Sequence, residues 1–202
     1  MMDRFFSYAS TAPRRSEDAG ITLLSGPPCC GKTSLLFQFA VNRAAESGRS
    51  VVFICSKGRL ESNPPFLSQG VDPSMSALHR VQIKYVEDGE EIRNYFAAFH
   101  LHDNFPAAVI VDDFADFFSE SAKLGTLGSC ELLLSDVQHG DTPRSLFIYK
   151  RWISSIYTIQ GDGVGSYILS NIGNSESGTK EARTAKYSIA LQYLVLEEIR
   201  NG

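Results

Sequence analysis

The sequence predicts an α/β fold with a mostly parallel central sheet and flanking helices. Strand and helix patterns alternate through the first half of the chain. Residues 107–111 are apolar throughout, which indicates a strand buried on both faces, as in a parallel sheet. A glycine-containing turn at 26–33 separates the first predicted strand from the first predicted helix.

The first half of the chain supplies four strand patterns and one long helix. Short runs with apolar residues at 21–25, 51–54, 81–86 and 107–111 predict the strands. Residues 34–45 carry apolar side chains near helical spacing and predict the helix.

A second helix is predicted after Asp88, whose side chain can cap the helix start, and acidic residues follow in the first turn. Its apolar stripe consists of Ile92, Tyr95, Phe96 and Phe99. The segment 58–70 is predicted to be a loop because it contains two consecutive prolines.

The second half is less regular. Residues 130–137 and 146–160 are predicted to be helical, and residues 166–170 and 188–196 are predicted to be strands. Between these strands, residues 173–186 are small and polar, with three basic side chains.

Composition favours one soluble domain. The 202 residues are 43% hydrophobic and 21% charged, and no apolar run reaches the roughly 18 residues that span a bilayer. We expect a flexible N-terminal segment over 1–20 and a single domain over 21–200, with no membrane contact. A net charge of −4 argues against a protein that coats nucleic acid through overall charge, but it allows a local basic patch.

The four cysteines, Cys29, Cys30, Cys55 and Cys130, contain no C-x-x-C pair. Neither a zinc site nor a disulfide framework is predicted, which fits a reduced, intracellular protein. The adjacent pair is either a redox sensor at a helix start or two small residues that fill a loop, and we favour the second interpretation.

The turn at 26–33 matches the phosphate-binding pattern G-x-x-x-x-G-K-[ST] at every fixed position. Its glycines allow backbone N–H groups to surround a phosphate, Lys32 adds positive charge, and the Thr33 hydroxyl can ligate Mg²⁺. The pattern therefore predicts bound ATP and Mg²⁺, with Lys32 also assigned a catalytic role. The predicted nucleotide-binding residues are Gly26, Pro27, Pro28, Cys29, Cys30, Gly31, Lys32, Thr33 and Ser34.

Asp112 directly follows the buried strand that ends at Val111. Such a strand carries a carboxylate to the sheet edge beside the phosphate loop, where Asp112 can hold Mg²⁺ through a water. Asp112 could instead cap a helix. The neighbouring Asp113 is a candidate to activate the attacking water, and it could equally cap the next segment.

This order of elements resembles the RecA-type recombinases, a family of P-loop NTPases. The segments 33–40 and 109–113, together with the short chain, resemble most closely the SWIM-type zinc-finger-associated protein, the ATPase subunit of a Shu-like complex. The resemblance implies a mediator of homologous recombination and double-strand break repair. It also implies binding to single-stranded DNA with a SWIM-domain zinc-finger protein, weak DNA-stimulated ATP hydrolysis, and a nuclear location.

Two positions depart from the family pattern. Lys57 stands where recombinases carry a water-activating glutamate, and Glu61 lies one turn further on. Asn171 and Ile172 occupy the expected end of the fifth strand, where the family carries a glutamine that senses the γ-phosphate. Both departures predict slow hydrolysis, so a non-hydrolysing assembly subunit without DNA contact remains an alternative.

Two loops of recombinases face DNA, and by position residues 123–129 and 173–186 correspond to them. The second carries the residues that the resemblance assigns to single-stranded DNA: Lys180, Arg183 and Lys186. A solvated surface loop is the competing interpretation of this segment.

Phe6 and Ala9 match the F-x-x-A form that joins recombinase protomers, although residues 105–108 match the same form by accident.

Other phosphate-loop classes fit less well. A small nucleotide or metabolite kinase usually carries an arginine-rich lid, and the arginines here are scattered. A signalling GTPase would carry the guanine-reading motif N-K-x-D, which is absent from the chain.

Overall fold

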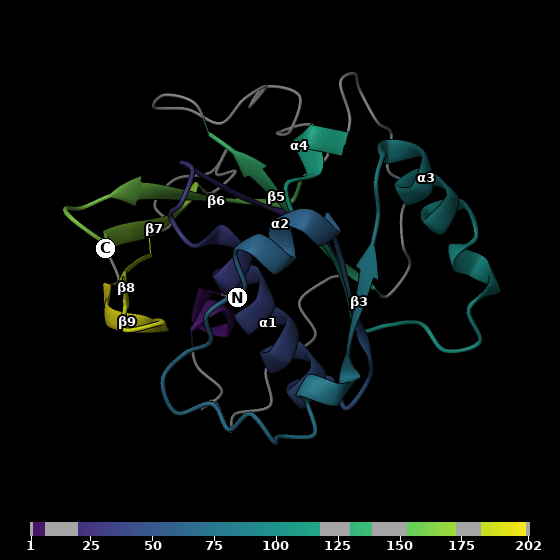
Figure 1. The fold of residues 1–202 in the computed structure, drawn as a ribbon, viewed down its shortest axis with the longest axis horizontal. Helices are drawn as coiled ribbons and strands as arrows, with labels where there is room; N and C mark the ends of the chain where they lie inside the picture. The colour runs from purple at the N-terminus through teal and green to yellow at the C-terminus, as the bar shows by residue number, and fades with distance from the viewer. Residues whose placement is uncertain (1, 7–19, 118–129, 139–152, 173–182, 201–202) are drawn as a thin grey trace.

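A computed structural model describes residues 2–6, 20–117, 130–138, 153–172 and 183–200. In these residues the central feature is a nine-stranded sheet with the order β3-β2-β4-β5-β1-β6-β7-β8-β9 (Figure 1). The strands from β3 to β6 in this order pair in parallel, and the last three join antiparallel. The predicted α/β fold with a mostly parallel sheet is confirmed.

The strands are β1 (Ile21–Gly26), β2 (Val51–Cys55), β3 (Val81–Tyr85), β4 (Ala108–Val111), β5 (Glu131–Val137), β6 (Ser155–Gly161), β7 (Ser166–Ile172), β8 (Thr184–Ala190) and β9 (Tyr193–Arg200). The α-helices are α1 (Lys32–Ser47), α2 (Lys57–Ser62), α3 (Gly89–Ala97) and α4 (Phe114–Phe117). Short 3-10 turns occur at Met2–Phe5, Leu78–Arg80 and Phe99–Leu101.

Elements with strong local signals lie where the sequence predicts them. The strands β1 to β4 and the helix α1 are confirmed within a few residues. Asp88 caps α3, because its carboxylate accepts hydrogen bonds from the backbone N–H groups of Glu90 (2.9 Å) and Glu91 (3.0 Å).

The second half of the chain corrects three predictions. Residues 130–137 contain the strand β5 rather than a helix, and the described part of 146–160 forms β6. The single strand predicted at 188–196 is divided between β8 and β9, which turn at Leu191 and Gln192, both with positive φ. Short apolar runs buried on both faces show no periodicity that separates a strand from a helix.

The prediction of a loop over 58–70 is also partly wrong, because α2 occupies the first residues of that segment.

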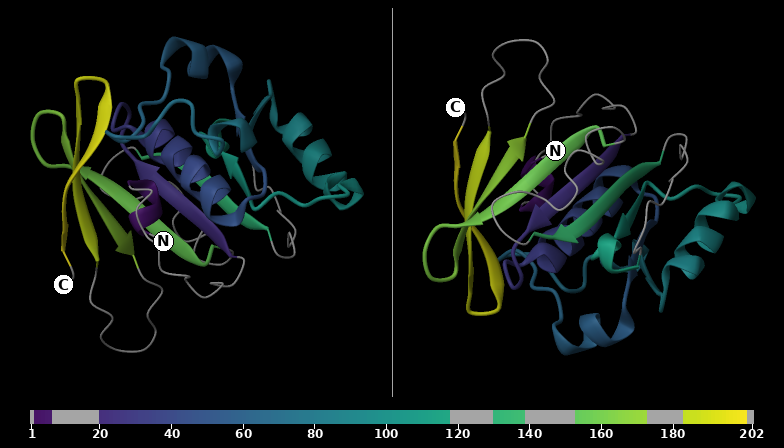
Figure 2. Two further views of the ribbon diagram at one scale, coloured as in Figure 1. Left: turned by 90° about the horizontal axis from the view of Figure 1, so that it is seen from below. Right: turned by 90° about the horizontal axis from the view of Figure 1, so that it is seen from above.

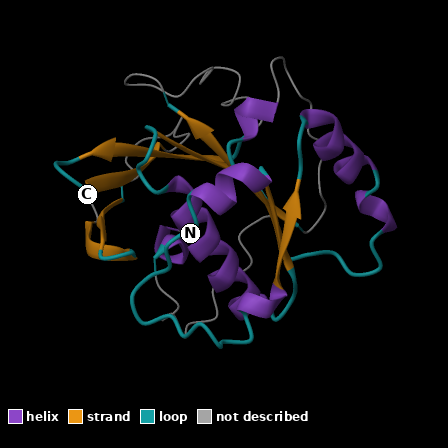
Figure 3. Cartoon of the chain, viewed as in Figure 1, coloured by secondary structure: helices purple, strands orange, loops and turns teal. Residues whose placement is uncertain are grey.

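Figure 3 shows most of the helices beside the parallel strands, whereas β7 to β9 lie at the opposite end of the molecule.

The sheet separates two hydrophobic clusters. On β4, Ile110 belongs to the cluster under α1, whereas Val109 and Val111 belong to the other cluster with Ile92 of α3. Figure 2 shows α1 along one face of the sheet. Burial on both faces explains why β4 is apolar throughout.

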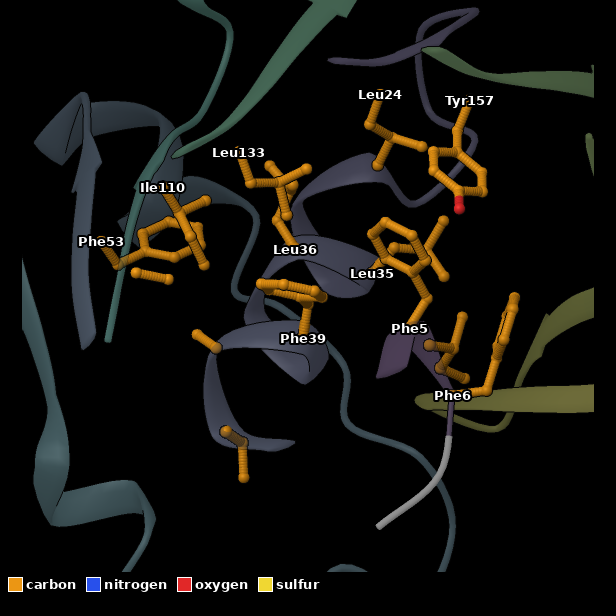
Figure 4. Packing of buried hydrophobic residues seen from close by; sticks show 14 of the residues in the cluster. Phe5, Phe6, Leu24, Leu35, Leu36, Phe39, Phe53, Ile110, Leu133 and Tyr157 are labelled. Atoms are coloured by element: carbon orange, nitrogen blue, oxygen red, sulfur yellow. The ribbon is translucent and has the colours of Figure 1, made fainter. Parts of the chain in front are cut away.

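The N-terminus corrects the predicted flexible segment over 1–20. Met2, Phe5 and Phe6 are at most 2% exposed and belong to the cluster under α1. The Phe5 ring lies 5.5 Å from the rings of both Phe39 and Tyr157 (Figure 4). Residues 2–6 are therefore part of the core, while 7–19 lie outside the described residues.

Replacing Phe5 with alanine should lower the free energy of unfolding by about 3–5 kcal/mol, because it empties a fully buried ring site. Phe5→Leu should recover most of this loss because it refills the site. Urea unfolding followed by circular dichroism measures both variants. A loss below about 1 kcal/mol for Phe5→Ala would contradict the burial of this segment.

Candidate nucleotide-binding site

The phosphate loop connects β1 to α1, and its two motif glycines are favoured for different reasons, Gly26 by close packing and Gly31 by its backbone conformation. A Cβ atom on Gly31 would lie 2.5 Å from Ile189 Cδ1, and its φ of 83° also favours glycine. A Cβ atom on Gly26 would lie 2.8 Å from the Cβ of Ile159. The strand, loop and helix that the motif requires are all present.

Lys32 folds back over this loop. Its ammonium group donates to the carbonyl oxygens of Gly26 (3.2 Å) and Pro27 (3.0 Å), and the residue is buried. The Ser34 hydroxyl instead accepts a hydrogen bond from the backbone N–H of Phe66 (3.0 Å), so this side chain ties α1 to the segment after α2.

The two residues predicted to hold Mg²⁺ lie together. Thr33 Oγ1 donates to Asp112 Oδ2 at 2.7 Å, and Ser135 Oγ donates to Asp112 Oδ1 at 2.7 Å. The same serine oxygen accepts from the backbone N–H of Asp113 at 2.8 Å. Sequence reasoning missed Ser135 because β5 was assigned to a helix, although a lone serine within an apolar run was a usable signal.

Burial raises the pKa of Asp112, and the nearby charge of Asp113 raises it further. The hydrogen bonds from Ser135 and Thr33 and the charge of Lys32 oppose this shift. A cation beside the carboxylate would favour its ionised form in the same way.

The donor set fits Mg²⁺, which prefers oxygen ligands and keeps few of them from protein. A hydroxyl and a carboxylate meet at Thr33 and Asp112. The described residues contain no group of three or more His, Cys, Asp or Glu that could hold a metal. Phosphate and water oxygens would supply the remaining ligands.

Asp113 lies beside this pair in a left-handed backbone conformation with φ of 51°. Its Oδ2 pairs with the Arg59 guanidinium, which also pairs with Asp116. Its Oδ1 is buried and has no hydrogen-bond partner within the described part of the chain. One carboxylate oxygen of Asp113 is thus paired with Arg59, and the other is buried with no partner among the described residues.

Lys57 and Glu61 are exposed on α2 and lie close to each other. Lys57 Nζ lies 3.9 Å from Glu61 Oε1, and both side chains are at least 60% exposed on α2. An exposed pair of this kind contributes little to stability and leaves Glu61 without a fixed place in the site.

The prediction for the fifth strand was wrong. Asn171 and Ile172 lie at the end of β7, an antiparallel strand, whereas the fifth strand along the chain is β5. It is followed by Gln138, which is 5% exposed and donates its backbone N–H to Gly26 O at 2.8 Å. The chain therefore carries a glutamine beside the phosphate loop after all.

Two of the three predicted basic residues, Arg183 and Lys186, form ion pairs. Arg183 Nη2 lies 3.5 Å from Asp3 Oδ1, and Lys186 Nζ lies 2.8 Å from Asp162 Oδ2 and 3.8 Å from Glu197 Oε2. Lys180, 123–129 and 173–182 lie outside the described residues, so the DNA contact stays a prediction.

The predicted protomer contact also stays a prediction. Phe6 is 2% exposed, and its ring lies 5.5 Å from that of Tyr187 in its own chain. A protomer contact through Phe6 would therefore require this segment to leave the core. Ala9 lies outside the described residues.

Of the adjacent cysteines, Cys29 is exposed and Cys30 is buried. Burial raises the pKa of the Cys30 thiol, despite the opposing charge of Lys32. A protonated, buried thiol fits the interpretation that Cys30 fills the loop.

Comparison with known proteins supports the fold. No family model matches the chain, and no curated protein matches it. Among solved structures, it is similar to the crystal structure of the RadB recombinase, with a TM-score of 0.59 and 16% identity. The match covers 88% of this chain and 90% of that one. The chain has the α/β fold of a RecA-type P-loop NTPase.

No helix in the described residues combines the length and apolarity needed to cross a membrane.

Asp112→Asn should stabilise the nucleotide-free protein at neutral pH. Because the folded pKa of Asp112 exceeds its ordinary value of 3.8, its contribution to stability is complete below that value and is lost as pH rises through the folded pKa. The gain should grow as pH rises from 3.8 to the folded pKa of Asp112 and then level off. Urea unfolding from pH 4 to 8 measures it.

The same variant should bind Mg·ATP about 10–100-fold more weakly, since it loses the carboxylate that faces the metal. Ser135→Ala keeps the carboxylate and serves as the comparison. An Asp112→Asn variant with unchanged Mg·ATP affinity would exclude this residue from the metal site.

Proposed function

We propose that the chain binds Mg·ATP at the phosphate loop and acts as a recombinase paralogue, a mediator in homologous recombination and double-strand break repair. The observation that carries the nucleotide assignment is the 2.7 Å hydrogen bond between Thr33 and Asp112. It joins the two nucleotide motifs across 79 residues on a RecA-type fold.

Different groups of the site would bind the phosphates and the Mg²⁺ ion. Backbone N–H groups of the loop would hold the β-phosphate, and the Lys32 ammonium would exchange two loop carbonyls for phosphate oxygens. Thr33 and Asp112 would hold Mg²⁺, which neutralises charge on the β- and γ-phosphates when bound.

Hydrolysis should be slow because Lys57, at the position of the family glutamate, cannot accept a proton from water. Asp113 is the best remaining candidate: its buried Oδ1 has no hydrogen-bond partner within the described part of the chain. Arg59 holds the other oxygen and reduces the mobility that a proton acceptor needs.

Lys32→Ala should weaken Mg·ATP binding at least about tenfold, equivalent to about 1.4 kcal/mol. Wild-type turnover should be measurable but far below the ~1–1000 s⁻¹ of typical enzymes, and lost in Lys32→Ala and Asp113→Asn. Calorimetric titration and phosphate release measure these effects. Lys84→Ala, on the edge strand β3, is the matched lysine control and should behave as wild type.

The outcome separates the alternatives. Tight Mg·ATP binding with background turnover in every sample, with or without single-stranded DNA, would favour a non-hydrolysing assembly subunit. Transfer of the γ-phosphate to a specific small acceptor would favour a metabolite kinase. Failure of the wild type to bind Mg·ATP would overturn the assignment.

For DNA we propose a contact by the segment 173–186 that is independent of base sequence, with Lys180 and Arg183 as phosphate-binding residues. Lys186 is paired with two carboxylates and should contribute less. Lys180→Ala with Arg183→Ala should therefore weaken single-stranded DNA binding and lower its salt slope by about one per lost contact.

Lys186→Ala is the matched control for this experiment and should change the slope less. Fluorescence anisotropy across a salt series measures both. A slope equal to wild type in the double variant would place DNA binding elsewhere or exclude it.

We propose a SWIM-domain zinc-finger protein as the partner and the nucleus as the location, both from the resemblance of the nucleotide motifs. Affinity capture from intact cells followed by mass spectrometry tests the partner. Repeated capture without any SWIM-domain protein would contradict it.

A further inference from the structure

Two tyrosines from the antiparallel strands bond to the phosphate loop. Tyr187 of β8 donates its hydroxyl to the carbonyl oxygen of Cys30 at 2.7 Å, and Tyr167 of β7 donates to the carbonyl oxygen of Cys29 at 3.2 Å. The two rings stack with centroids 5.5 Å apart. The Tyr187 bond is buried and the Tyr167 bond is exposed.

These bonds fix the direction of loop N–H groups. In a planar trans peptide the C=O of one residue points opposite to the N–H of the next. A donor that holds the Cys30 carbonyl therefore orients the Gly31 N–H, and a donor on the Cys29 carbonyl orients the Cys30 N–H. Each hydroxyl also polarises its peptide, which makes the opposite N–H a better donor.

The loop needs this support because its backbone is strained. Cys29 has φ of 59°, a left-handed conformation that non-glycine residues adopt only rarely. A carbonyl held on each side of the Cys30 Cα restricts the peptide rotations that would relieve the strain. Burial raises the pKa of Tyr187 well above 10, so its hydroxyl remains a donor at neutral pH.

Behind Tyr187 lies the N-terminal segment. The Phe6 and Tyr187 rings are 5.5 Å apart, and both side chains are fully buried. The segment is held on α1 by a hydrogen bond from Asn42 Nδ2 to Arg4 O (2.7 Å) and by an ion pair between Arg4 and Glu46 (2.9 Å).

We propose that Tyr187 is a positioning residue for the nucleotide phosphates, assisted by Tyr167, and that Phe6 couples docking of the N-terminal segment to nucleotide affinity. This inference rests on the proposed nucleotide binding. Because coupling free energies are reciprocal, bound nucleotide also strengthens docking of the segment.

Tyr187→Phe removes one hydroxyl and keeps the ring, so the stack with Tyr167 and Phe6 survives. Its dissociation constants for MgADP and MgATP should both rise about fivefold to tenfold, as expected for the loss of one supporting hydrogen bond, since the two ligands share the β-phosphate. Adenosine affinity should not change. Tyr167→Phe should show a smaller effect of the same kind. Calorimetric titration of the full chain measures all three ligands.

Tyr193→Phe is the matched control, because Tyr193 is a half-exposed tyrosine in the adjacent strand β9. It should bind all three ligands as wild type does. If Tyr187→Phe does not fold, Tyr167→Phe alone decides, since its hydroxyl lies at the surface. A purely structural role would lower the melting temperature and leave the phosphate-dependent affinities unchanged, which would overturn the proposal.

Phe6→Ala and Phe6→Leu test the coupling. Phe6→Ala should weaken MgADP binding several-fold, and Phe6→Leu, which refills the space beneath Tyr187, should restore most of it. Equal MgADP affinity in Phe6→Ala and wild type would overturn the coupling. Wild-type protein that binds no MgADP would instead refute the proposed function, so the two failures are distinguishable.

Discussion

The candidate site depends on one buried carboxylate whose two oxygens both accept hydrogen bonds. Asp112 is enclosed by the helix α1 and the strands β4 and β5, and its two oxygens accept hydrogen bonds from Thr33 and Ser135. A buried charge is tolerated only when it is hydrogen-bonded or paired. The strand order supports this arrangement, since β5 lies between β4 and β1 and brings Ser135 beside Asp112.

Local signals in the sequence predicted the part of the site that lies within short segments. The phosphate loop needs fixed glycines and a lysine at fixed spacing, and β4 needs an apolar run before Asp112, so both could be recognised without tertiary structure. Ser135 and Gln138 could not be recognised in the same way. Their roles depend on β5 pairing with β1 and β4, and a short apolar run does not show whether it forms a strand or a helix.

The antiparallel strands were harder still to predict. The turn between β8 and β9 is made by Leu191 and Gln192, and neither residue type favours a positive φ. The contacts of Tyr167 and Tyr187 with the loop join residues more than 130 positions apart. Likewise, the burial of Phe5 and Phe6 could not be predicted, because polar residues stand on both sides of this pair in the sequence.

Enclosure of Asp112 has a consequence for the lifetime of the protein. Because burial raises the pKa of Asp112, a chain that keeps this carboxylate ionised is less stable when empty than when a cation is bound there. A ligand present at about 100 times its dissociation constant stabilises a fold by about 2.7 kcal/mol. The nucleotide would then act as a folding ligand, and the abundance of the protein would follow the supply of Mg·ATP, because proteases degrade chains that unfold.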